Sequence, residues 1–127
     1  MKYTIDKKEQ YTLLDLHEEK LDSTMAPNLK SDLVSLHAEG SKNFILNLGD
    51  VKYIDSSGLS ALLVGNRITT DDGGILVITT VNDHVLKLIK ISQLDSILRI
   101  LPTVEEAVDA VFMHEIEGDL KSDQNGN

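Results

Sequence analysis

The apolar residues of this chain follow two different periods, which predict strands and helices. Short and nearly continuous apolar runs at residues 44–48 and 75–78 are typical of strands covered on both faces. Nearer the N-terminus, two strand-like segments flank the polar residues 7–10, which predicts a hairpin. We expect the strands at residues 2–6, 11–16, 44–48, 75–78 and 97–101.

A spacing of three and four residues between other apolar positions predicts four helices. Leu29, Leu33 and Leu36 mark the first, and Pro27 stands in its first turn, where a missing N–H does little harm. In the last helix, Thr103 opens a capping box ahead of an apolar stripe that ends at Phe112. We expect the helices over about 24–39, from near 57 to the turn at 71–74, over about 82–91 and over about 103–113.

These elements follow one another in the order β-β-α-β-α-β-α-β-α. The order predicts an α/β fold with a mixed, mostly parallel sheet of about five strands and four helices. A chain of 127 residues with 41% apolar content fits one domain, which we place at residues 1–113. The acidic remainder, 114–127, has too few apolar residues to offset its ordering entropy, and we expect a tail without fixed structure.

Charge and composition exclude several classes of function. A net charge of −9 repels phosphate backbones and anionic lipid, so we expect no nucleic-acid partner. The chain has no cysteine, which excludes disulfides and a cysteine nucleophile. The N-terminus lacks the apolar region of a signal peptide, and no apolar run approaches the roughly 20 residues that span a bilayer. We therefore expect a cytoplasmic protein without direct membrane insertion.

Polar groups gather at two places where a predicted strand gives way to a helix. Such places expose helix N-termini with unpaired N–H groups. The first is Asp22-Ser23-Thr24 and the second is the segment 50–58. In the second, we expect one serine to cap the helix, the other to stand free, and Gly58 to leave room for a partner surface. The residues there fit ordinary helix caps, and they also fit a phosphoacceptor, whose phosphate would add about −1.5 to −2 charges over a positive helix end.

The segment 47–59, Asn-Leu-Gly-Asp-Val-Lys-Tyr-Ile-Asp-Ser-Ser-Gly-Leu, resembles the signature of the anti-sigma factor antagonist family, the STAS domain. Lys20-Leu21-Asp22 and Asp72-Gly73-Gly74 resemble two further parts of that family's pattern. The resemblance implies an antagonist that binds an anti-sigma factor serine kinase, releases a sigma factor and is reset by a serine phosphatase. It also implies phosphorylation of the serine directly after the aspartate, which is Ser56.

By the same resemblance, the partner binds at the two strand-to-helix junctions. The implied partner-binding residues are Asp22, Ser23, Thr24, Asp55, Ser56, Ser57, Gly58 and Leu59. Met25, at the start of the first helix, is a further candidate contact.

Two departures from the family pattern leave another partner open. Ser60 stands where the family often has a second glycine, and Glu18-Glu19-Lys20 replaces the usual residues before the Leu-Asp turn. The alternative is an accessory subunit of a lipid-transport or other signalling complex without phosphorylation control. A third hypothesis is a small-molecule sensor that uses the N-terminus of the second helix as an anion pocket.

An enzyme would need a base beside Ser56. The four candidates are His17, His37, His84 and His114. The nucleophile-elbow pattern Gly-x-Ser-x-Gly and the phosphate-binding loop are both absent, and no His or carboxylate pair has the spacing of metal ligands. We therefore expect no enzyme activity, no cofactor and no metal.

Overall fold

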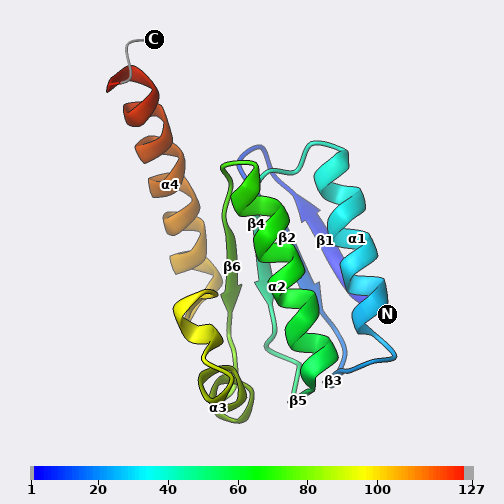
Figure 1. Cartoon of the computed structure of the whole chain (residues 1–127). Helices are drawn as coiled ribbons and strands as arrows, with labels where there is room; N and C mark the ends of the chain where they lie inside the picture. The colour runs from blue at the N-terminus through cyan, green and yellow to red at the C-terminus, as the bar shows by residue number, and fades with distance from the viewer. Residues whose placement is uncertain (1, 125–127) are drawn as a thin grey trace.

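A computed structural model describes residues 2–124 of the chain, and its main feature is a five-stranded mixed sheet (Figure 1). The strands run in the order β1-β2-β4-β6-β7. Only β1 and β2 pair antiparallel, as the predicted hairpin requires, and the other neighbours are parallel. The strand bounds are β1 Tyr3–Lys7, β2 Thr12–Leu16, β4 Phe44–Asn47, β6 Leu76–Thr79 and β7 Arg99–Leu101.

A second and much smaller ladder lies beside this sheet. It consists of β3, Lys20–Leu21, paired parallel to β5, Tyr53–Ile54. The sequence did not predict this ladder, because two residues are too few to carry a period. It matters for the site because each strand leads directly into a segment that precedes a helix.

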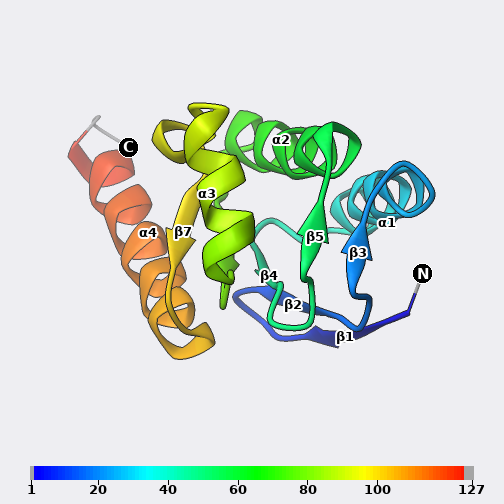
Figure 2. The ribbon, with the colours of Figure 1, turned by 90° about the horizontal axis from the view of Figure 1, so that it is seen from below.

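Four α-helices cover the two faces of the large sheet, as the sequence predicted (Figure 2). They are α1 Ala26–Ala38, α2 Ser56–Asp71, α3 Asp83–Ile91 and α4 Val104–Gln124, with a short 3-10 turn η1 at Leu94–Ser96. The first three helices share one core with Phe44 and Leu46, whereas α4 packs on the other face against Ile45 and Val77. This alternation along the strands is why the sequence shows continuous apolar runs.

Helix α4 is longer than the sequence predicted. Residues from 114 were expected to form a tail without fixed structure, but the helix continues through Gln124. Two contacts hold its middle: His114 donates a hydrogen bond from Nε2 to the carbonyl oxygen of Gly73, and Asn43 donates one to Glu115. The spacing of Glu117 and Lys121 also favours a helix. Residues 125–127 lie outside the described part, and the domain boundary at residue 113 stays a prediction.

No helix within residues 2–124 combines the length and the hydrophobicity needed to cross a membrane.

Candidate functional site

The N-terminus of α2 is capped by Asp55. Its Oδ1 accepts a hydrogen bond from the backbone N–H of Gly58 at 3.0 Å, and its backbone is extended, as is usual at a cap. The sequence led us to expect a serine in this role, and that expectation is wrong. Because the carboxylate does the capping, Ser56 becomes the first residue of the helix, where its side chain is exposed. Ser57 is half-buried.

Gly58 has an internal role that the sequence analysis did not foresee. The residue is buried, and a Cβ atom placed on it would lie 2.2 Å from the carbonyl oxygen of Leu21 and 2.5 Å from Cγ1 of Ile54. The missing side chain therefore lets α2 approach the β3–β5 ladder. The expectation that Gly58 leaves room for a partner protein is corrected accordingly, since the space is filled from within.

The segment before α1 forms a tight turn around Asp22. Its Oδ1 accepts hydrogen bonds from the backbone N–H and the hydroxyl of Thr24, at 3.0 and 2.6 Å. The hydrogen bond from the Thr24 side chain is the main reason why the pKa of Asp22 is below its ordinary value. The turn, with Ser23 and Thr24 exposed, therefore presents a carboxylate that stays ionised near neutral pH.

The β3–β5 ladder places these two junctions side by side. Leu21 pairs with Ile54, so Asp22 and Asp55 follow neighbouring strand ends. The N–H of Asp55 also points to the carbonyl oxygen of Leu21, with 3.4 Å between nitrogen and oxygen. We call this surface the serine rim; it comprises Asp22, Ser23, Thr24, Asp55, Ser56, Ser57 and Leu59. The structure thus brings together every predicted partner-binding residue except the buried Gly58.

Tyr53 lies next to the serine rim and was missed as a candidate contact. It is the residue of β5 that precedes Ile54, and its side chain is 45% exposed. Its place inside the family signature was the available signal, but alternation along a two-residue strand could not be read from the sequence. Met25 is half-buried and packs against the main core, which limits what it can offer a partner.

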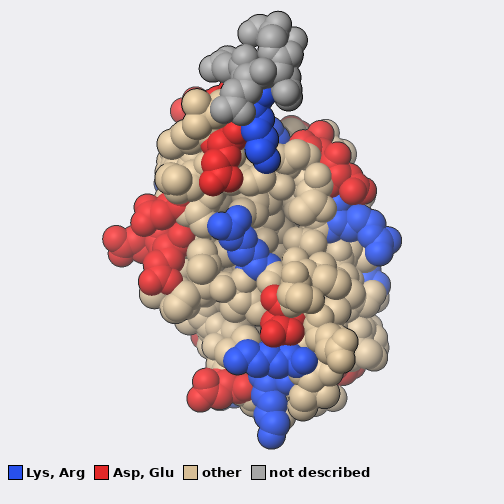
Figure 3. All heavy atoms as spheres, turned by 60° about the vertical axis from the view of Figure 1, so that its left-hand side comes forward, with Lys and Arg blue, Asp and Glu red and all other residues tan. Residues whose placement is uncertain are grey.

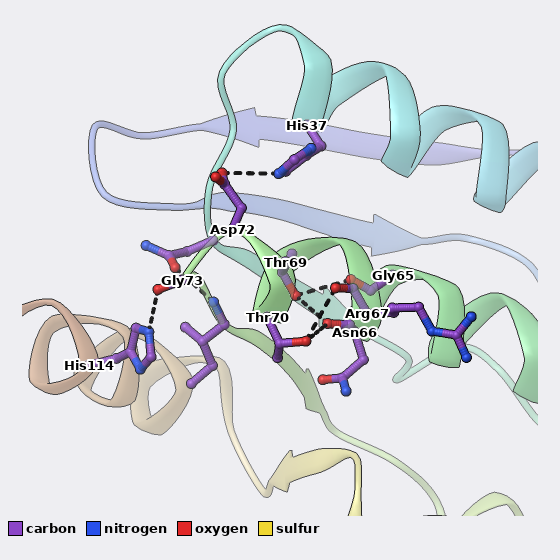
Figure 4. A network of polar contacts seen from close by, with 11 residues as sticks. His37, Gly65, Asn66, Arg67, Thr69, Thr70, Asp72, Gly73 and His114 are labelled. Atoms are coloured by element: carbon purple, nitrogen blue, oxygen red, sulfur yellow. Dashed lines mark hydrogen bonds and ion pairs between the residues drawn. The ribbon is translucent and has the colours of Figure 1, made fainter. Parts of the chain in front are cut away.

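None of the histidines within residues 2–124 forms a hydrogen bond with Ser56. His17 lies 3.2 Å from the carboxylate of Asp50, and His37 lies 3.2 Å from that of Asp72. His114 contacts Gly73, as Figure 4 shows beside the His37 pair. The described residues also hold no group of three or more His, Asp or Glu side chains placed to bind a metal ion.

Together, the sheet order and the serine rim define an α/β domain that presents a serine at a capped helix N-terminus. The chain belongs to the STAS domain family, whose sequence pattern matches residues 3–107. The family resemblance predicted from the segment 47–59 is therefore confirmed.

Relatives with curated descriptions carry the name anti-sigma factor antagonist. BtrV of Bordetella bronchiseptica, described as a proposed antagonist, is 29% identical over 110 residues, or 87% of this chain and 94% of its own. A Thermotoga neapolitana protein with a similar description is 30% identical over 73 residues. That match covers 58% of this chain and spans 65% of the length of the relative.

Solved structures share the fold. A proposed anti-sigma factor antagonist of Thermotoga maritima superposes with a TM-score of 0.77 at 23% identity, covering 86% of this chain and 93% of that one. The phosphorylated form of the Bacillus cell fate determinant SpoIIAA superposes with a TM-score of 0.67 at 20% identity, and the match covers 87% of this chain and 99% of that one. A sulfate transporter family protein from Wolinella succinogenes superposes with a TM-score of 0.73 at 21% identity, and the match covers 84% of this chain and 88% of that one. At these identities the likeness shows the fold alone.

Proposed function

We propose that this chain is an anti-sigma factor antagonist whose serine rim binds an anti-sigma factor serine kinase and so frees a sigma factor. Phosphorylation of Ser56 blocks that binding, and a serine phosphatase restores it. The observation that carries the proposal is the placement of Ser56: exposed, first in a helix that Asp55 already caps, and next to the turn at Asp22. The protein acts by binding and needs no catalytic group of its own.

The helix N-terminus can accept a phosphate without unfolding. The N–H groups of Ser56 and Ser57 have no intrahelical acceptor, as is usual in a first turn. A phosphate on the Ser56 hydroxyl would place about −1.5 to −2 charges close to this positive end. The modification is therefore compatible with the fold, and its effect falls on the partner.

The charge of the serine rim makes that effect large. Asp22 and Asp55 already bring two carboxylates to the surface that a partner must cover. A partner carboxylate held about 4 Å from an added phosphate charge would meet a repulsion of a few kcal/mol at an effective dielectric constant near 20. Because about 1.4 kcal/mol is a tenfold change in affinity, phosphorylation would release the partner.

The proposal is tested by incubating the chain with its cognate kinase and ATP and mapping the product by mass spectrometry. We expect phosphate on Ser56, none on a Ser56→Ala variant, and at least tenfold weaker kinase binding by Ser56→Asp. Ser35→Asp is the matched control, since it adds the same charge at an exposed position on α1 and should bind normally. Phosphate on another residue, or full binding by Ser56→Asp, would contradict the proposal.

Co-purification from native cells tests the alternative of an accessory subunit. The expected companion is a kinase-type protein of the cytoplasm. A transporter ATPase in its place would favour the accessory role over the switch.

A further inference from the structure

The C-terminal part of α4 extends beyond the sheet that the helix covers. Among the residues of α4 whose side chains are described, through Lys121, the last buried one is Val111, and the last hydrogen bonds to the rest of the domain are those of His114 and Glu115. In Figure 1 the end of α4 lies past the sheet, at the opposite end of the molecule from the start of α2. The family pattern ends at residue 107, so this extension lies beyond the matched region.

This extension carries an exposed apolar stripe. Its members are Phe112, Met113, Ile116 and Leu120, with exposed fractions of 44%, 54%, 52% and 55%. We call them the C-terminal stripe. Ile116 lies four residues after Phe112 and three after Met113, and Leu120 follows four residues later, so all four lie on one side of the helix, whereas the buried Ala107 and Val111 lie on another. The same spacing forms the seam of paired helices in coiled coils.

Acidic residues accompany the C-terminal stripe. Six acids stand against one lysine in residues 104–121, and Glu105, Asp109 and Glu117 among them are exposed. Figure 3 turns this side forward and shows acidic side chains along one edge of the face, separate basic side chains nearer its centre, and uncharged surface among them. A helix that packs against nothing is only marginally stable in water. Burial of its apolar stripe against another helix would therefore stabilise this part of α4.

We infer that the C-terminal stripe is a docking surface for an amphipathic helix of net positive charge on another protein. The acids on α4 attract lysine and arginine beside the seam of such a helix, and its apolar residues cover the stripe. They disfavour a second copy of this chain, because two acidic helices would face one another. They also repel nucleic acid and anionic lipid.

The test uses the full chain and a synthetic helical peptide of about three heptads, with leucine at positions a and d and lysine or arginine at e and g. Binding is measured by calorimetry, and amide shifts locate it. We expect binding that weakens with salt and shifts centred on residues 112–121. A peptide with glutamate at e and g, and a scrambled basic peptide of the same composition, should bind at least tenfold more weakly.

Ile116→Glu should weaken peptide binding at least tenfold, because it puts a like charge in the middle of the stripe. Ile97→Glu is the matched control: Ile97 is 56% exposed but precedes β7, and its substitution should leave binding unchanged. Circular dichroism confirms that both variants fold. Equal binding by Ile116→Glu or by the scrambled peptide would overturn the inference.

Sedimentation of the chain alone tests whether a second copy of this chain, rather than another protein, covers the C-terminal stripe. A monomer supports the inference, whereas a dimer that Ile116→Glu dissociates would show that a second copy covers the stripe. The outcome is independent of the proposed switch, since Ile116→Glu leaves Ser56 and its surroundings untouched.

Discussion

Asp55 and Gly58 fix the start of α2 by different physical means. The aspartate satisfies a backbone N–H that the helix cannot satisfy itself, and the glycine removes a side chain where two backbones meet. Neither function needs the Ser56 hydroxyl, which remains exposed at the surface. The separation of structural and surface roles among adjacent residues is what allows a serine here to be modified without loss of the fold.

Gly58→Ala should destabilise the protein by about 1–3 kcal/mol or more, because the new methyl group would overlap the Leu21 carbonyl oxygen and force α2 away from β3. Urea denaturation measures the change. Gly118→Ala is the matched control, since a Cβ there meets nothing within 4 Å and alanine favours the interior of α4 by about 0.5–1 kcal/mol. An unchanged free energy of unfolding for Gly58→Ala would show that α2 can move away from the β3–β5 ladder without loss of stability.

Among the elements, the buried side chain of Asn43 joins three segments that the sequence keeps far apart. Its Nδ2 donates hydrogen bonds to the carbonyl oxygen of Gln10 at 2.9 Å and to Glu115 at 2.6 Å. Its Oδ1 accepts one from the backbone N–H of Ile75 at 3.0 Å. The residue thus ties the hairpin, the start of β6 and the middle of α4, and it helps to explain why α4 continues past residue 113.

Asn43→Ala should lower the free energy of unfolding by about 2–4 kcal/mol, because two backbone groups lose their partner inside the protein. Chemical denaturation gives the value, and hydrogen exchange should show faster opening of α4 after Val111. Asn28→Ala, an exposed position on α1, serves as the comparison and should change stability little. Unchanged exchange in α4 would mean that other contacts hold the helix.

On the scale of the whole molecule, the sheet order makes β1 an edge strand next to α1. Tyr3 of β1 donates a hydrogen bond from its hydroxyl to the Asp32 carboxylate on α1. Burial, followed by that hydrogen bond and the negative charge of Asp32, raises the pKa of Tyr3 to about 12. The neutral phenol is therefore favoured in the folded state.

This shift predicts a loss of stability at alkaline pH. The stabilisation is fully present below the ordinary tyrosine value of about 10 and disappears as the pH rises through about 12. Unfolding free energies measured from pH 8 to 12 should fall more steeply for the wild type than for Tyr3→Phe. Parallel curves for the two proteins would contradict a link between this phenol and folding.

The sequence by itself determined the order along the chain of the four helices and of the five strands of the large sheet, the antiparallel hairpin, the parallel rest of that sheet and the position of the Asp-Ser-Ser-Gly segment. These features depend on the spacing of apolar residues and on which faces of each element are buried, and both can be read from the order of apolar and polar residues in the sequence. The sequence also named all seven residues that form the serine rim, but it missed the neighbouring Tyr53 and placed the buried Gly58 at the surface.

Only the tertiary structure decided that Asp55 caps α2, that Gly58 faces Leu21, that Asp22 lies beside Asp55, and that α4 continues to Gln124. Each of these depends on a contact between groups distant in sequence or on a choice among equally good capping residues. Local sequence patterns indicate whether a residue is buried, but they do not indicate which atoms its side chain contacts. In this protein those contacts determine both the arrangement of the serine rim and the length of α4.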